Sequence, residues 1–167
     1  GTSEIQQSII SLFRLRETVH SKGAYYKGMA EELAELSKET GGPVAAQAID
    51  VLNNFLLIAR SLKITKSQYR MFLLADMMTW VEVANATCRK ASYDIGESTI
   101  SRECMSAVAR LFARESVEKV YLNTVKIIEA GEEVPEEFKQ RFASLVLGKI
   151  YEGAVKDMDL VAKELTS

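Results

Sequence analysis

The sequence predicts an all-α domain: an up-and-down four-helix bundle preceded by an N-terminal helical arm. Glycine and proline are scarce, with nine and two residues among 167, whereas sandwiches, barrels and doubly wound sheets need many tight turns. Alanine and glutamate, which favour helices, occur 18 times each, while the poor helix former aspartate occurs five times. Between a few clear breaks, apolar residues recur at spacings of three and four, which is the helical period.

Four short breaks divide the chain into helical stretches. They cover residues 41–43, 63–67, 95–99 and 131–135. Pro43 and Pro135 fall where a helix begins, a position that tolerates proline because its missing N–H has no helical partner there. We therefore divide the chain into an N-terminal helical arm, residues 1–40, and a bundle, residues 41–167. The arm itself has a break near 21–23.

Each stretch of the predicted bundle carries one apolar stripe. The stretch 44–63 has Val44, Ala48, Val51, Phe55, Ile58 and Leu62. The stretch 67–94 has Met71, Leu74, Met78, Val81 and Cys88, and 101–130 has Met105, Val108, Phe112, Val120, Thr124 and Ile127. The stretch 136–165 has Phe138, Phe142, Leu145, Tyr151, Met158, Val161 and Leu165. Short loops between four long helices make neighbouring helices antiparallel.

The composition excludes several classes of function. With 21 basic and 23 acidic residues, the chain lacks the basic excess expected of a nucleic-acid partner. His20 is the one histidine, so the Glu-x-x-His pair that it forms with Glu17 cannot be repeated, as di-metal bundles require. We therefore expect no metal site. Cys88 and Cys104 lie in apolar stretches, where free cysteine acts as a small hydrophobe.

Some segments admit both a structural and a functional interpretation. A charged network between helices is one candidate, formed by Arg89, Lys90, Arg110, Arg114, Glu115, Glu118 and Lys119. Asn85 interrupts an apolar stripe, as register-setting polar residues do. The basic and aromatic segment 138–149 is either a core helix or a surface for a membrane or a partner helix. The runs 55–59 and 71–75 are apolar nearly all round, so either the arm or another subunit or domain covers them.

The opening residues resemble a known family. Gly1, Thr2, Ser3, Glu4, Ile5 and Gln6 follow one another in this order. This run resembles the end of the catalytic region in the acyl-CoA dehydrogenase family, where a Tyr-Glu-Gly-Thr-Asn/Ser-Glu/Gln-Ile-Gln run opens a helix. The resemblance implies that the catalytic base is the glutamate just before Gly1, so this chain carries no catalytic residue. It further implies that Gly1 lies near the substrate thioester, and Thr2, Ser3 and Glu4 near the flavin.

A second, looser resemblance covers about residues 67–130. The segments 74–77, 88–92 and 109–115 are similar to paired helices of the family's C-terminal helical domain, which longer members carry in an additional copy. The run 150–154, Ile-Tyr-Glu-Gly-Ala, echoes the catalytic run but lies within a helical stretch, so we interpret Glu152 as a chance match or a relic of duplication.

Together these resemblances imply a C-terminal structural or interaction domain of an FAD-dependent acyl-CoA dehydrogenase, an oxidoreductase that converts acyl-CoA thioesters to 2-enoyl-CoA. FAD would be bound by the parent protein and not by this chain alone. We expect as partners the catalytic domains of the same polypeptide, a second copy in a homodimer, and a membrane surface or electron-transfer partner. The location expected is the cytoplasm, or the mitochondrial matrix in a eukaryote.

Two alternatives remain from the sequence. The first is a stand-alone helical-bundle protein-interaction module whose opening residues match the family by chance. The second is a di-metal or other bundle enzyme, which would require bound metal. The residues that precede Gly1 in the intact polypeptide distinguish the first alternative from the dehydrogenase interpretation. Elemental analysis of the purified protein for bound metal tests the second.

Overall fold

The structure, a computed structural model, describes residues 2–59, 62–93, 100–129, 135–143 and 149–166. Within these ranges the ordered elements are helices and no strand occurs, so the all-α prediction is confirmed. The helices are α1 (Thr2–His20), α2 (Ala24–Ala34), α3 (Gly42–Ala59), α4 (Gln68–Ser92), α5 (Arg102–Glu129), α6 (Glu136–Ala143) and α7 (Ala154–Thr166). Two short 3-10 turns, η1 (Lys38–Thr40) and η2 (Ile64–Lys66), connect them.

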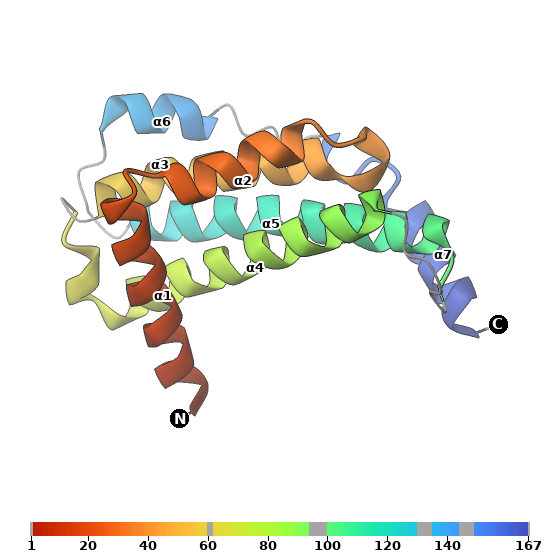
Figure 1. Cartoon of the computed structure of the whole chain (residues 1–167). Helices are drawn as coiled ribbons and strands as arrows, with labels where there is room; N and C mark the ends of the chain where they lie inside the picture. Colours follow the sequence, from red (N-terminus) through yellow and green to blue (C-terminus); the bar gives the residue numbers. More distant parts are fainter. Residues whose placement is uncertain (1, 60–61, 94–99, 130–134, 144–148, 167) are drawn as a thin grey trace.

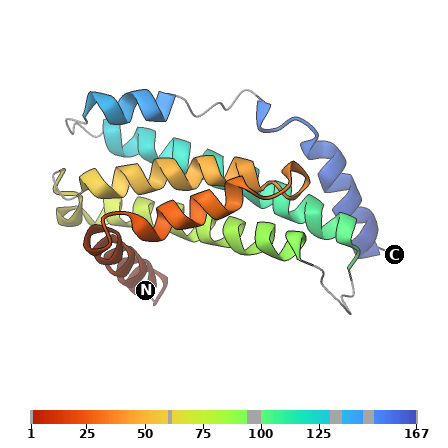
Figure 2. The same cartoon turned by 45° about the horizontal axis from the view of Figure 1, so that its top comes forward.

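Helices α2 to α5 lie side by side and alternate in direction (Figure 1). Helix α1 crosses one end of this group against α4, and its N-terminal half projects from the body. Helix α6 packs on α3, and α7 packs on α5 at the end of the molecule opposite α1 (Figure 2). The two ends of the body therefore carry helices that are covered on one side only.

The predicted breaks near 21–23, at 41–43 and at 63–67 fall at the ends of helices, whereas 95–99 and 131–134 lie outside the described residues. The arm breaks after α1, where Lys22 and Gly23 take the left-handed backbone conformation with φ of 52° and 84°. A side chain at Gly23 would also meet the amide of Asn53 at 3.0 Å, so glycine is required there on two counts. Helix α3 begins at Gly42 with Pro43 in its first turn. Ser101 accepts a hydrogen bond from the backbone N–H of Cys104 at 3.1 Å and caps α5.

The prediction of one continuous helix over 136–165 is wrong. Helix α6 ends at Ala143 and α7 begins at Ala154, and residues 149–153 form a turn. Gly153 has φ of +77°, which a right-handed helix excludes. The carbonyls of Ile150 and Glu152 accept hydrogen bonds from Arg114 rather than from the helical backbone. The apolar stripe of this stretch is therefore divided between two short helices.

Helix α3 provides the centre of the core. Ala45, Ile49, Leu52, Phe55 and Leu56 have no exposed surface, and they belong to one apolar cluster with Tyr26 and Leu33 of α2. The arm packs on α3 and so covers part of the apolar run 55–59, one of the two possibilities that the sequence leaves open. Phe55 of this run contacts Phe138 of α6, and Leu57 is 42% exposed. By length and composition α3 would also suit a membrane span, but 61% of this 18-residue window is buried inside the structure.

Candidate functional site

The site residues predicted from the family resemblance fall at the tip of α1. Gly1 lies outside the described residues, as do the side chains of Thr2 and Glu4. Thr2, Ser3 and Glu4 form the first turn of α1, and Ser3 is exposed. The structure therefore places these residues on the projecting end of a helix, and it brings none of the other candidate residues to them within the described part of the chain.

Helix α1 exposes most of its large apolar side chains and buries two hydroxyl residues, an arrangement that we call reversed polarity, although Arg16 and His20 are also exposed among the apolar side chains. Ser11 and Thr18 are fully buried, with Leu15 between them at 6% exposure. We call the opposite side the outer face of α1. Its members are Ile5, Ile9, Leu12, Phe13 and Val19, exposed by 63, 61, 41, 62 and 37%. Ile5, Ile9, Leu12 and Phe13 follow one another within three- and four-residue spacings, and Val19 lies seven residues after Leu12 with the exposed Arg16 between them. All five therefore lie on one stripe along the helix.

A polar cluster holds the buried side of α1 against α4 and α2. Arg14 contacts both carboxylate oxygens of Glu82, with Nε 2.7 Å from Oε1 and Nη2 2.8 Å from Oε2. The hydroxyl of Tyr26 donates to Oε1 of Glu82 at 2.9 Å, and Glu17 accepts from Nη1 of Arg14 at 2.8 Å. The guanidinium also lies 4.7 Å from the ring centre of Tyr25, a cation–π contact. Helices α1, α2 and α4 thus meet at one carboxylate.

Burial and charge shift the ionisation of this cluster. Burial is the main cause that raises the pKa of Tyr26 far above its ordinary value, and the neighbouring Glu82 carboxylate adds to it. Hydrogen bonding to Glu82 raises the pKa of Arg14 against the opposing effect of burial. Tyr26 therefore stays neutral and Arg14 charged over the physiological range. The cluster has the properties of a fixed structural contact, because its hydrogen bonds join three helices and engage both oxygens of the Glu82 carboxylate.

Grooves run along both sides of α1. On one side a groove of about 380 Å³ is lined by Ile9, Ile10, Phe13, Arg14, Thr79, Glu82 and Val83. On the other side a groove of about 600 Å³ is lined by Leu12, Leu15, Arg16, Val19, His20 and Thr65. The outer face of α1 is thus a ridge between two open grooves. A surface of this shape accommodates neighbouring helices, whose side chains pack into such grooves.

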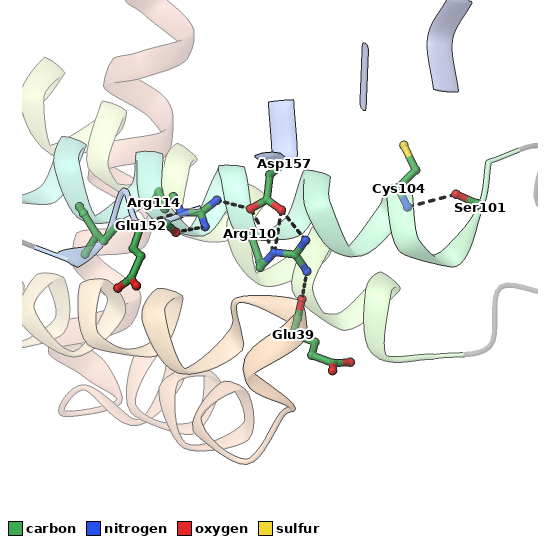
Figure 3. Close-up of polar contacts among 8 residues, drawn as sticks. Glu39, Ser101, Cys104, Arg110, Arg114, Glu152 and Asp157 are labelled. Atoms are coloured by element: carbon green, nitrogen blue, oxygen red, sulfur yellow. Dashed lines mark hydrogen bonds and ion pairs between the residues drawn. The ribbon is translucent and has the colours of Figure 1, made fainter. Parts of the chain in front are cut away.

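A second polar cluster, around Asp157, fixes α7 to α5 (Figure 3). The Asp157 carboxylate is 4% exposed as a residue and accepts hydrogen bonds from Nε and Nη2 of Arg110 and from Nη1 of Arg114. Arg110 also donates to the carbonyl of Glu39 at 2.6 Å, and Arg114 donates to the carbonyls of Ile150 and Glu152 at 2.7 and 2.9 Å. We call these three charged side chains the Asp157 cluster.

Burial alone would raise the pKa of Asp157, but hydrogen bonds from Arg110 and Arg114 outweigh it, so the pKa lies below the ordinary value of an aspartate. The carboxylate is ionised at neutral pH and paired with two guanidinium groups. A carboxylate held in this way cannot act as a general base, because its lone pairs are already engaged. The Asp157 cluster therefore positions helices rather than reacting.

Other candidate residues have structural surroundings. The predicted charged network does not form among its own members in the described part of the chain. Arg110 and Arg114 instead meet Asp157, which no sequence pattern marks, and Arg89 pairs with Glu32 at 2.7 Å. Phe138 is buried and stacks on Phe142, whereas 144–148 lie outside the described residues.

Burial raises the pKa of the Cys88 thiol to about 12 and also raises that of Cys104. Both cysteines are buried and free, which fits their interpretation as small hydrophobes. Across the described ranges, no three His, Cys, Asp or Glu side chains gather as metal ligands. Glu17 and His20 both lie on α1, but the Glu17 carboxylate accepts a hydrogen bond from Arg14. The Oδ1 atom of Asn85 is buried and has no hydrogen-bond donor in the described part of the chain.

Comparison with family models, with curated proteins and with solved structures finds no match for this chain.

Proposed function

We propose that this chain is a non-catalytic helical docking domain that joins the rest of its protein through the outer face of α1. The observation that carries the proposal is the reversed polarity of this helix. Six large apolar side chains are exposed along the helix, five of them on its outer face, while Ser11 and Thr18 on the opposite side are fully buried. Burying such a side chain is worth about 1.5–3 kcal/mol, and contiguous exposed apolar patches mark interaction sites.

The grooves beside α1 support a helical partner surface. A ridge flanked by two grooves receives helices along its length, in the way that helices pack within a bundle. Arg14 is bound to Glu82 and Glu17, so the charge of this arginine is compensated within the domain. The partner surface is therefore apolar where it meets Ile5, Ile9 and Phe13.

The body that docks there is, in this proposal, the catalytic part of an FAD-dependent acyl-CoA dehydrogenase, which oxidises acyl-CoA thioesters to 2-enoyl-CoA. The support is the resemblance of residues 1–6, together with the looser resemblance within 67–130. Residues 2–6 open α1, so the segment that resembles the catalytic region and the outer face of α1 belong to the same helix. The C-terminal helical-bundle identity within that family rests on the same resemblance.

In such a parent, Gly1 would border the thioester, and Thr2, Ser3 and Glu4 would border the flavin. The described residues offer FAD an open surface, because Ser3 is exposed on the first turn of a projecting helix. They do not enclose a flavin, and no step of the reaction is assigned to them. By the same resemblance, the protein belongs in the cytoplasm, or in the mitochondrial matrix of a eukaryote.

The experiment is isolation of the intact native polypeptide, followed by its visible spectrum and an anaerobic titration with acyl-CoA. The proposal expects flavin absorbance that bleaches as the thioester is oxidised. A colourless polypeptide that leaves acyl-CoA unchanged would contradict the dehydrogenase assignment.

A colourless polypeptide that leaves acyl-CoA unchanged would favour a stand-alone helical interaction module. One observation speaks for this alternative: apolar residues from Leu15 to Phe138 belong to a single buried cluster, so the helices have a core of their own.

A further inference from the structure

Helix α7 carries a second exposed apolar stripe, at the end of the molecule opposite α1. We call it the α7 seam, and its members are Val155, Met158, Ala162 and Leu165. Val155, Met158 and Leu165 are exposed by 71, 52 and 76%, and Ala162 is exposed as well. The spacings of three, four and three residues are those of a helix that packs lengthwise on another helix.

The inner side of α7 is held in place by specific contacts. The Asp157 cluster joins the helix to α5, and Ala154 is buried beside it. Near the other end of α7, Glu164 accepts hydrogen bonds from the backbone N–H of Ser101 at 2.6 Å and from its hydroxyl at 3.2 Å. A helix fixed at both ends on one side presents its opposite side in a defined orientation. The α7 seam is therefore a pre-organised surface, and docking on it costs little ordering of the helix.

We propose that the α7 seam is a self-association surface, on which α7 of a second copy packs in the antiparallel direction about a two-fold axis. The argument is self-complementarity of size. When Met158 of one copy lies opposite Ala162 of the other, the two-fold axis places Ala162 of the first copy opposite Met158 of the second. Val155 of each copy then lies opposite Leu165 of the other copy. A large side chain thus meets a small one at the centre, which is the arrangement that fills such interfaces.

The charges beside the seam are compatible with this register. Asp159 and Lys163 lie on the same flank of α7, and within the described residues neither forms an ion pair with its own chain. In the antiparallel pair, Asp159 of one copy and Lys163 of the other are offset by about 3 Å along the helix axis, two steps of helical rise. The two Asp159 carboxylates also lie close to the two-fold axis, and the positive charges of the Lys163 side chains compensate their negative charges.

The expected association is weak, because the seam, residues 155–165, spans only about three turns of helix. A stable specific interface buries about 1,600 Å², and one pair of 13-residue helices offers less. Dimerisation should therefore depend on protein concentration. The α7 seam is separate from the outer face of α1 (Figure 2), so this inference does not depend on the proposed function and survives its failure.

Sedimentation equilibrium of the full 167-residue chain over a range of concentrations tests the proposal. We expect a monomer–dimer equilibrium that Met158→Lys weakens about tenfold or more, since a charge replaces an apolar group at the centre of the interface. Tyr69→Lys, a matched change at an exposed apolar residue of α4 that lies outside both exposed stripes, should leave the equilibrium unchanged. A chain that stays monomeric throughout, or a dimer that Tyr69→Lys disrupts and Met158→Lys does not, would overturn the proposal.

Disulfide trapping tests the register even if one variant misfolds. Met158→Cys and Ala162→Cys chains are purified separately, mixed and oxidised, and the native Cys88 and Cys104 are buried. The antiparallel arrangement predicts that the mixed pair, Cys from position 158 of one chain and position 162 of the other, dominates over either self-pair. Equal or greater yields of the self-pairs would rule out the proposed register.

Discussion

Asp157 of α7 and Arg114 of α5 form a buried ion pair, with Oδ2 of the carboxylate 2.5 Å from Nη1 of the guanidinium and side-chain exposures of 6 and 9%. Because Arg114 also binds the carbonyls of Ile150 and Glu152, one arginine holds both the start of α7 and the turn before it. The same contacts explain why the helical period of the last stretch does not yield a continuous helix.

Replacing Asp157 with asparagine should release α7 from α5. The change removes the charge that two guanidinium groups share, and breaking a buried pair by removing one partner costs about 3–5 kcal/mol. We expect a lower midpoint of thermal unfolding and faster hydrogen exchange of the amides in α7. Asp159→Asn is the matched control, because Asp159 is an exposed aspartate on the same helix. Equal exchange in both variants would mean that the ion pair does not hold the helix.

The stability of the Asp157 cluster should decline in acid. The pKa of Asp157 is lower in the folded protein than its ordinary value, so its contribution is complete above the ordinary carboxyl pKa of about 3.9. This contribution is lost as the pH falls through the folded pKa, since the unfolded chain then binds the proton more readily. Urea unfolding measured from neutral to acid pH should give a steeper loss for the parent chain than for Asp157→Asn. Parallel curves would contradict this linkage.

Loss of the Glu82 carboxylate should release α1. Glu82→Ala removes the hydrogen-bond partner of both Arg14 and Tyr26, and hydrogen bonds to charged groups are worth about 1.5–3 kcal/mol. We expect faster hydrogen exchange within residues 11–19 and a lower free energy of unfolding. Glu17→Ala, which removes the other carboxylate bound to Arg14, should have a smaller effect because Tyr26 keeps its partner. The reverse order of effects would show that Glu82 is not the central contact.

The helical class and most helix boundaries could be predicted from local signals. Pro43, Gly23 and Ser101 act on their own neighbours through fixed φ, positive φ and capping, so their effects are visible in the sequence. Asp157 could not be identified in this way, because its partners lie 47 and 43 residues earlier in the chain. Its position among exposed residues of an amphipathic stretch gave no signal of burial.

The polarity of α1 was also beyond sequence reasoning. Its apolar residues predict a helix, but which side faces the body is decided by the Arg14–Glu82 contact, whose members are 68 residues apart. The usual expectation that the apolar side packs inward fails here because this polar contact and the small buried hydroxyl residues hold the other side. That conflict between pattern and packing is the basis of the proposed docking site.

The measurement that tests the central claim most directly is the reactivity of a thiol on the outer face of α1. Phe13→Cys and Tyr93→Cys place thiols at positions exposed by 62 and 61%, one on α1 and one at the end of α4 far from it (Figure 1). In the 167-residue chain both should react with a maleimide at similar rates. In the intact native polypeptide, docking predicts that the thiol at position 13 becomes protected while the thiol at 93 stays reactive. Unchanged reactivity at position 13 in the intact polypeptide would contradict the account.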